Sequence, residues 1–367
     1  MNTARDEWVY SFSADALQKQ MRFAIDEFNR EQVRWSKVKS VDRSQVSQRL
    51  KWSESLLAKV QRSPAPPLAQ ALVVVAHYRP YVRVDYYADP VFSDRLTGNH
   101  AAMFGASLQL ANACIAISAP GPASTFRALA SDRLCDWHFM GDTQMYSLAR
   151  YDEAGARIDN ITDWSLAEFK KHYQPGRGKK PRPITKEAIF HYVYAVLHDP
   201  SYRETYAQNL KREFPRIPLY GDSETTFWQW AAWGEALMVL HIGYEQAAPF
   251  ALVRSDVPDE KVRAAGQSPK CILKSDKEAG RIAIDSETTL TGVPREAWAY
   301  LLGNRCAIDW VLDQYKEKKP KDPTIRAKFD TYRFADHKEM VIALLMRVTT
   351  VSVETVEIVA AMKGAGR

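Results

Sequence analysis

The stretch from Ile184 to Pro218, ITKEAIFHYVYAVLHDPSYRETYAQNLKREFPRIP, carries two consecutive helix signals. Thr185 is a predicted N-cap, and the helix that it begins must end before Pro200. Asp199 is the predicted cap of a second helix, with Pro200 at its first position. Apolar residues on one face support the two helices: Ile189, Val193 and Val196 in the first, and Tyr202, Tyr206 and Leu210 in the second. The stretch therefore predicts a helical region in mid-chain.

The helical pattern extends over residues 166–247. Residues 164–173 form a short predicted helix before the pair. After it, Ser223 opens what we expect to be the longest helix, whose apolar positions recur at spacings of three and four. They are Phe227, Trp230, Gly234, Leu237, His241 and Tyr244. A helix so rich in tryptophan is expected to be buried, with His241 hydrogen-bonded in the core.

The flanking regions have β character. Short apolar runs at 72–75 and 114–117 predict strands, 137–151 predicts one or two more, and 270–284 predicts a hairpin. Residues 294–315 are predicted helical, and so is the part of the tail that carries Met340, Ile342, Leu345 and Met346. We therefore expect an α+β fold, with a mixed β-sheet core, an N-terminal helical pair and an inserted helical subdomain.

Composition shifts divide the chain into four predicted parts. Residues 1–62 form two helices, one capped by Ser13 and one carrying Val46, Leu50, Leu57 and Val60, and we expect this pair to dock or couple to other domains. Residues 63–165 form a mixed-sheet lobe, 166–247 a helical subdomain with a basic loop, and 248–367 a β-hairpin and helices that complete the same domain as the mixed-sheet lobe.

Composition excludes several classes of protein. The chain has 367 residues, 46% hydrophobic and 26% charged, which rules out collagen-like, coiled-coil and wholly disordered proteins. The net charge of +6 is too small by itself to indicate nucleic acid. Four distant cysteines form no CxxC pair, and no segment resembles an export signal or membrane span. We expect a soluble, cytoplasmic protein without membrane contact.

Catalytic motifs are absent. There is no GxxxxGK[ST] loop, GxGxxG turn, GxSxG elbow or HExxH helix, so we assign no catalytic, cofactor-binding or metal-binding residue. Two weaker motifs remain. Asp89-Pro90-Val91-Phe92 resembles the loop that holds a flipped base in amino-methyltransferases, but its second proline is missing. His191, His198 and Asp199 invite a metal site, although Asp199 serves better as a helix cap.

Local charge is the positive signal. Between Glu168 and Lys186 there are seven basic residues and one acid, in a glycine- and proline-rich loop suited to tracking phosphates or simply to solvation. Residues 316–328 hold six basic residues against two acids, with the same ambiguity. In the run from Tyr78 to Tyr87, Arg79 and Arg83 alternate with aromatic residues, as in base-reading surfaces or in a strand with salt bridges.

The order of segments resembles the C-terminal specificity region of type ISP restriction–modification enzymes. The similar stretches are Arg5–Ser13, Tyr78–Asp89, Ile184–Pro218, Gly292–Tyr315 and Thr350–Val359. The segment from Trp298 to Tyr315 is also similar to an element of type IIG recognition domains. Residues 117–132 depart from the family, which commonly has a glycine-rich turn and Pro-Phe-Ser there.

The resemblance implies a module that holds double-stranded DNA and reads target bases for adenine methylation or translocation-coupled cleavage. It implies DNA contacts by seven basic residues: Arg79, Arg83, Arg177, Lys179, Lys180, Arg182 and Arg305. The methyltransferase and translocase domains are expected in cis or as a partner protein. S-adenosylmethionine, ATP and Mg are expected only in those missing parts, so we expect no cofactor in this chain.

Two other functions stay open at this point. The chain is a degenerate or partner-completed DNA adenine methyltransferase if the Asp89–Phe92 loop is functional. It is a protein-interaction scaffold if the amphipathic helices of residues 13–62 dock on a methyltransferase or translocase.

Overall fold

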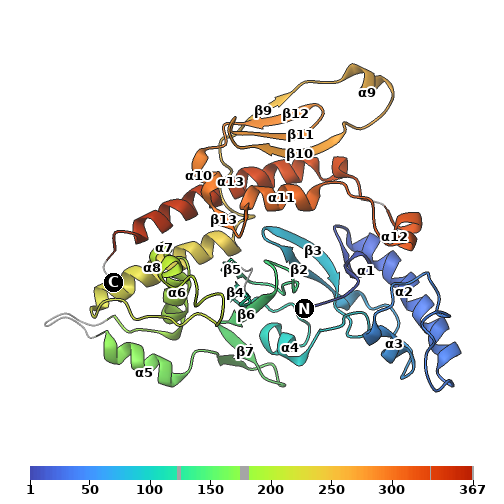
Figure 1. The fold of residues 1–367 in the computed structure, drawn as a ribbon, viewed down its shortest axis with the longest axis horizontal. Coiled ribbons are helices and arrows are strands. Elements are labelled where there is room, and N and C mark those ends of the chain that lie inside the picture. Colours follow the sequence, from blue (N-terminus) through green and yellow to red (C-terminus); the bar gives the residue numbers. More distant parts are fainter. Residues whose placement is uncertain (122–124, 174–181, 331, 366–367) are drawn as a thin grey trace.

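The computed structural model describes residues 1–121, 125–173, 182–330 and 332–365. Figure 1 shows helices and several small sheets in one α+β arrangement, which confirms the predicted fold class. A four-stranded sheet lies at one end of the molecule, and a long and a shorter C-terminal helix separate it from the rest. No helix in the described ranges is long and apolar enough to cross a membrane.

The N-terminal region contains a strand that the sequence did not predict. Its elements are α1 (Asp6–Val9), β1 (Tyr10–Ser11), α2 (Ala14–Trp35) and α3 (Glu54–Val60). Ser13 caps α2 by accepting a hydrogen bond from the backbone N–H of Ala16 at 3.3 Å, as predicted. The second predicted helix was wrong in its first half: Ser53 caps α3, so Val46 and Leu50 are buried before the helix begins.

The first sheet joins this N-terminal strand to the aromatic–arginine run. Its order is β1-β3-β2, with β2 at Val73–Arg79 and β3 at Val82–Tyr87, all antiparallel. The short 3₁₀ helix at Gln70–Leu72 precedes β2. Tyr10 of β1 lies opposite Tyr86, more than seventy residues along the chain. The N-terminal segment is therefore part of the sheet and not only a helical attachment.

A second sheet separates two packing environments. Strand β4 (Cys114–Ser118) lies between β5 (Ala128–Ser131) and β6 (Thr143–Ser147). Ile115 and Ile117 pack into the helical subdomain, whereas Cys114 and Ala116 face the N-terminal side. The neighbouring elements are α4 (Gly98–Phe104), β7 (Ala149–Tyr151) and β8 (Arg157–Asp159). Strand β6 is at the edge of its sheet.

Three helices of the helical subdomain begin at the predicted N-cap residues. The subdomain consists of α5 (Asp163–His172), α6 (Lys186–Val196), α7 (Pro200–Thr205) and α8 (Glu224–Ile242). Thr185, Asp199 and Ser223 each accept the capping hydrogen bond expected of them. Two predictions were wrong. Helix α7 ends at Thr205, before Leu210, and α8 is shorter than α2 and the C-terminal helix.

The C-terminal region builds the projecting sheet and its supporting helices. The sheet has the order β10-β11-β12-β9, and the 270–284 hairpin prediction is confirmed. Residues 294–315 are not one helix, because a small hairpin at 301–306 divides them. The elements are β9 (Val253–Asp256), α9 (Glu260–Ala264), β10 (Cys271–Asp276), β11 (Arg281–Asp285), β12 (Thr288–Thr291), α10 (Arg295–Ala299), β13 (Leu301–Leu302), β14 (Arg305–Cys306), α11 (Ala307–Tyr315), α12 (Pro323–Lys328), a 3₁₀ turn (Phe334–Asp336) and α13 (Lys338–Met362).

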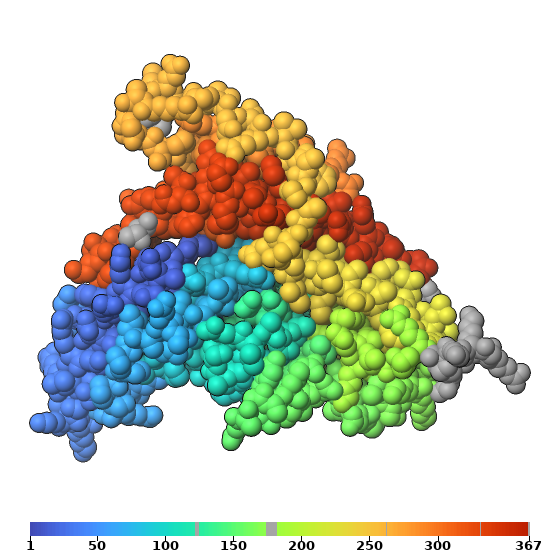
Figure 2. All heavy atoms as spheres, turned by 180° about the vertical axis from the view of Figure 1, so that it is seen from behind, coloured from blue at the N-terminus to red at the C-terminus, as the bar shows by residue number. Residues whose placement is uncertain are grey.

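Two hydrophobic clusters stabilise the molecule. One joins the N-terminal helices, the first sheet and the C-terminal helices, and the other fills the helical subdomain around Trp230. Seen from behind, the orange and red C-terminal region lies across both the blue N-terminal region and the yellow helices (Figure 2). The domain boundaries at residues 62, 165 and 247 stay a prediction.

Candidate nucleic-acid interface

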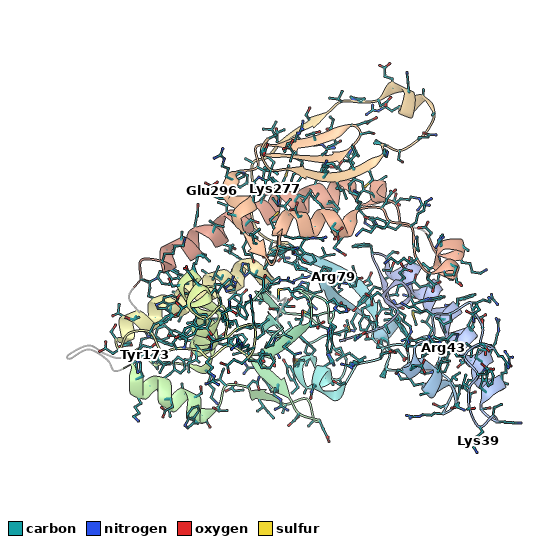
Figure 3. The ribbon with its side chains drawn as sticks, in the orientation of Figure 1. Lys39, Arg43, Arg79, Tyr173, Lys277 and Glu296 are labelled. Carbon is teal, nitrogen blue, oxygen red and sulfur yellow. The ribbon has the colours of Figure 1, made fainter. Side chains whose placement is uncertain are left out.

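Arg79 lies in an internal ion pair. Its guanidinium contacts the carboxylate of Asp136 at 2.7 Å, and the side chains of the two residues are 15% and 2% exposed. The guanidinium also lies 3.9 Å from the centre of the Tyr78 ring. Figure 3 shows Arg79 inside the molecule, whereas Lys39 and Arg43 lie at the outer end of the N-terminal region. The structure thus gives Arg79 a stabilising role between β2 and the segment at 136, and its contact with DNA stays a prediction.

Arg83 has a similar internal environment. Its Nε donates to Nε2 of His77 at 2.8 Å, and its two NH groups contact Glu245 at 2.7 Å and Asp132 at 3.2 Å. Burial, and next the charge of Arg83, lowers the pKa of His77 well below its usual value, so this imidazole stays neutral and can accept the hydrogen bond. Arg83 therefore joins β3 to the end of α8, and a role in base reading stays a prediction.

The remaining predicted DNA-contacting residues differ in environment. Arg305 is 43% exposed, pairs with Asp313 at 3.0 Å and lies over the Trp310 ring. Arg182 lies 3.5 Å from the centre of the Trp228 ring. Both could still turn toward a ligand, because neither guanidinium is enclosed. Three predicted residues lie outside the described residues: Arg177, Lys179 and Lys180.

The Asp89–Phe92 loop is held by internal contacts. Asp89 is buried and accepts a hydrogen bond from the backbone N–H of Val91 at 2.6 Å, while burial raises the pKa of its carboxyl. Lys59 donates to the carbonyls of Pro90, Val91 and Ser93 at 2.7 to 3.1 Å, and Arg5 donates to that of Phe92. These contacts give the loop a structural role and leave the methyltransferase alternative without support from its geometry.

His241 of the helical subdomain is a structural residue. His241 is 1% exposed and is hydrogen-bonded to Tyr194 and Thr355, which confirms the prediction of a core histidine. Asp199 caps α7 and accepts from the Tyr220 hydroxyl at 2.8 Å. Within the described ranges, no group of three or more His, Cys, Asp or Glu side chains could hold a metal ion.

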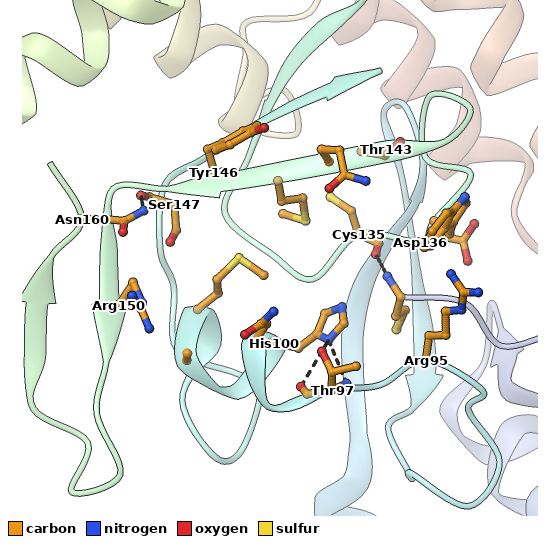
Figure 4. A pocket seen from close by; sticks show the side chains of 17 residues that line it. Arg95, Thr97, His100, Cys135, Asp136, Thr143, Tyr146, Ser147, Arg150 and Asn160 are labelled. Atoms are coloured by element: carbon orange, nitrogen blue, oxygen red, sulfur yellow. Dashed lines mark hydrogen bonds between the residues drawn. The ribbon is translucent and has the colours of Figure 1, made fainter. Parts of the chain in front are cut away.

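A cleft of about 480 Å³ opens beside the edge strand β6, which we call the arginine cleft. All five residues of β6 line it, and Figure 4 shows Arg150 and Arg95 on opposite sides of His100. Both arginines are exposed, and neither forms an ion pair with any residue that the structure describes. Burial lowers the pKa of His100 to about 4, so its ring is neutral near pH 7. The cleft therefore presents two guanidinium groups without ion-pair partners among the described residues, to which an anion can bind.

A second opening of about 850 Å³ lies between α2 and the loop that precedes α12, which we call the lysine cleft. Its cationic lining residues are Lys19, Lys316, Lys318, Lys319 and Lys328. Glu7 fixes the loop, because its carboxylate accepts from the backbone N–H groups of Lys321 and Asp322 at 2.9 and 2.8 Å. The basic run at 316–328, whose role the sequence left open, therefore borders a cleft and can meet an extended anion.

A comparison with family models then gives the relationship. The model of the type ISP C-terminal specificity domain matches residues 1–344. The chain belongs to this family. The family resemblance that the sequence suggested is thus confirmed. A search of curated proteins found no match.

Three solved structures share the fold of this specificity domain. The complex of DrdV with DNA has a TM-score of 0.89 and 40% identity, covering 100% of this chain and 35% of that chain. A nuclease-deletion mutant of the type ISP enzyme LlaGI, in complex with a DNA substrate mimic, has a TM-score of 0.79 and 26% identity, covering 99% and 32%. LlaBIII, an ATP-dependent type ISP enzyme bound to DNA, has a TM-score of 0.81 at 20% identity, covering 100% and 23%, and shows the fold alone.

The specificity domain spans about a third of DrdV and of LlaGI. Sequence reasoning found its family but missed Arg95 and Arg150. Each is a lone arginine in a segment without other basic residues nearby, and only the packing of α4 on β7, beside β6, brings the two to one cleft.

Proposed function

We propose that this chain is the DNA sequence-recognition module of a type ISP-like restriction–modification enzyme. The observation that carries the proposal is the match over the whole chain, at 40% identity, to a protein whose structure was determined in complex with DNA. In this role the chain binds double-stranded DNA and positions it for other domains or a partner protein, which methylate adenine or couple translocation to cleavage.

The two cationic clefts support the proposal. Arg95 and Arg150 in the arginine cleft, and the lysines of the other, are exposed cations at concave surfaces where phosphates can bind. Phosphate contacts set the register of a protein on a duplex, and a few side chains at base edges provide specificity. A surface of this kind needs no catalytic group of its own.

The chemistry belongs, in this proposal, to the part of the enzyme that the chain does not span. S-adenosylmethionine, ATP and Mg are expected to bind there and not to this chain. Defence against phage requires action on DNA that has entered the cell, and this role would place the enzyme in the cytoplasm.

Fluorescence anisotropy of a labelled duplex tests the proposal. Binding should weaken steeply as salt rises, since each phosphate contact releases condensed counterions. A calorimetric titration of the chain with S-adenosylmethionine should give no heat of binding. Absence of duplex binding at low salt would refute the recognition function, and cofactor binding would favour the methyltransferase alternative.

A further inference from the structure

Two exposed aromatic rings meet beside the arginine cleft. Tyr146 of β6 is 44% exposed, and Phe214, in the segment after α7, is 47% exposed. Their ring centres are 6.4 Å apart with an interplanar angle of 78°, an edge-to-face contact. Neither ring belongs to the two core clusters. The pair therefore stands outside the core that stabilises the fold.

The pair lies between two depressions. Tyr146 lines the arginine cleft, and Phe214 lines a hollow of about 380 Å³ together with Tyr206, which is 43% exposed. Figure 4 shows the Tyr146 ring on the opposite side of strand β6 from Arg150 and His100. An aromatic ridge thus borders a cationic cleft.

The electrostatics of this border suit a nucleic acid. Arg150 and Arg95 are free of ion pairs with the described residues, and the Arg95 guanidinium lies 5.1 Å from the centre of the Trp137 ring, which holds it at the cleft wall. Cations that can hold phosphates therefore lie on one side of strand β6, and rings on which bases can stack lie on the other side. Nucleic-acid-binding surfaces combine such cations with such rings.

We infer that Tyr146 and Phe214 contact the bases of bound duplex DNA at a partly unstacked step, while Arg95 and Arg150 hold the neighbouring phosphates. The inference rests on the proposed function. Apolar side chains that insert at a base step widen it and bend the duplex, and an edge strand can present such side chains without a helix in a groove. The step that opens most readily would then be favoured in the target.

The test uses the full chain and a short duplex in which 2-aminopurine replaces adenine at successive positions. Wild-type protein should raise the fluorescence at one or two positions, since unstacking relieves quenching. Tyr146→Ala and Phe214→Ala should abolish that rise and weaken binding roughly 10-fold. Tyr146→Phe should retain both properties, because the ring remains.

Matched controls separate this inference from general DNA binding. Trp164→Ala removes a ring that is 72% exposed on α5 and should change neither fluorescence nor affinity. Arg95→Ala and Arg150→Ala should each reduce the salt slope by about one phosphate contact. Circular dichroism should show unchanged folding in every variant.

The outcomes discriminate between the two proposals. If wild-type protein binds the duplex without a rise at any position, or if the aromatic variants match wild type, the aromatic contact is wrong and the recognition function stands. If wild-type protein binds no duplex, both are wrong.

Discussion

Gly234 of α8 lies directly against the backbone of His191 in α6. A Cβ at position 234 would come within 1.7 Å of the carbonyl oxygen of His191 and 3.1 Å of the backbone nitrogen of Ala195. The two helices that build the helical subdomain therefore cross at a point where only glycine fits. The neighbouring Trp230 is completely buried on the same helix.

Gly234→Ala should destabilise the protein by about 3 kcal/mol or more, because the added methyl group meets backbone and cannot be relieved by a rotamer change. Urea denaturation followed by tryptophan fluorescence measures the loss. Gly98→Ala is the control for glycine loss alone, because an added Cβ there would meet nothing within 4 Å and its φ is not positive. Equal effects at the two positions would contradict the close helix crossing.

Arg79→Ala should lower the free energy of unfolding by about 3 kcal/mol, because Asp136 would keep a buried carboxylate without its cation. Arg305→Ala removes an exposed ion pair and should lower the free energy of unfolding by less than about 1 kcal/mol. Thermal unfolding of both variants, compared with wild type, gives the two values. If Arg79→Ala instead leaves stability unchanged and alters base preference, its predicted DNA contact is correct and its structural role is secondary.

His241 makes stability depend on pH. Burial, and next the charge of Arg203, lowers its pKa from the usual 6.5 to about 3, so the unfolded chain takes up a proton at a higher pH than the folded one. Its contribution is therefore complete above pH 6.5 and is lost as pH falls toward 3, with a slope of up to about 1.4 kcal/mol per pH unit. Denaturation at a series of pH values should show this loss.

His241→Gln removes the titrating group, and its stability should fall less steeply between pH 6 and 4 than that of wild type. Part of the dependence of stability on pH should remain in this variant, because burial also lowers the pKa of His77 and of His198. Parallel curves for wild type and variant would contradict the buried neutral state of His241.

The lysine cleft predicts a uniform electrostatic effect. Replacement of both Lys318 and Lys319 by alanine should weaken binding to all duplex sequences equally and reduce the salt slope by about two contacts. Lys277, which pairs with Asp309 near the projecting sheet, lines none of the clefts described above and serves as the control. Anisotropy titrations at several salt concentrations measure the slope. A change in base preference, or no change in slope, would contradict phosphate binding at this cleft.

Local signals in the sequence predicted much of the fold. The caps at Ser13, Thr185, Asp199 and Ser223 were correct because each depends on one side chain and a backbone N–H two or three residues away. The small strands were harder. Pairing between Tyr10 and Tyr86 depends on tertiary packing, and no local periodicity marks a strand of two residues.

The candidate site was less predictable than the fold. Arginines that alternate with aromatic residues suggested a DNA surface. In the structure, Arg79 and Arg83 instead form ion pairs with acidic residues at positions 132, 136 and 245. Those partners are distant in sequence, so spacing could not reveal them. The exposed cations of the arginine cleft were missed for the same reason, since the cleft exists only after α4, β6 and β7 pack together.

A selection from random duplexes tests the central claim most directly. The full chain, incubated with a random pool at moderate salt, should enrich one sequence motif over successive rounds, with or without a methyltransferase partner. Recovery of no DNA, or of DNA without any common motif in either condition, would contradict the conclusion that this chain recognises a target sequence.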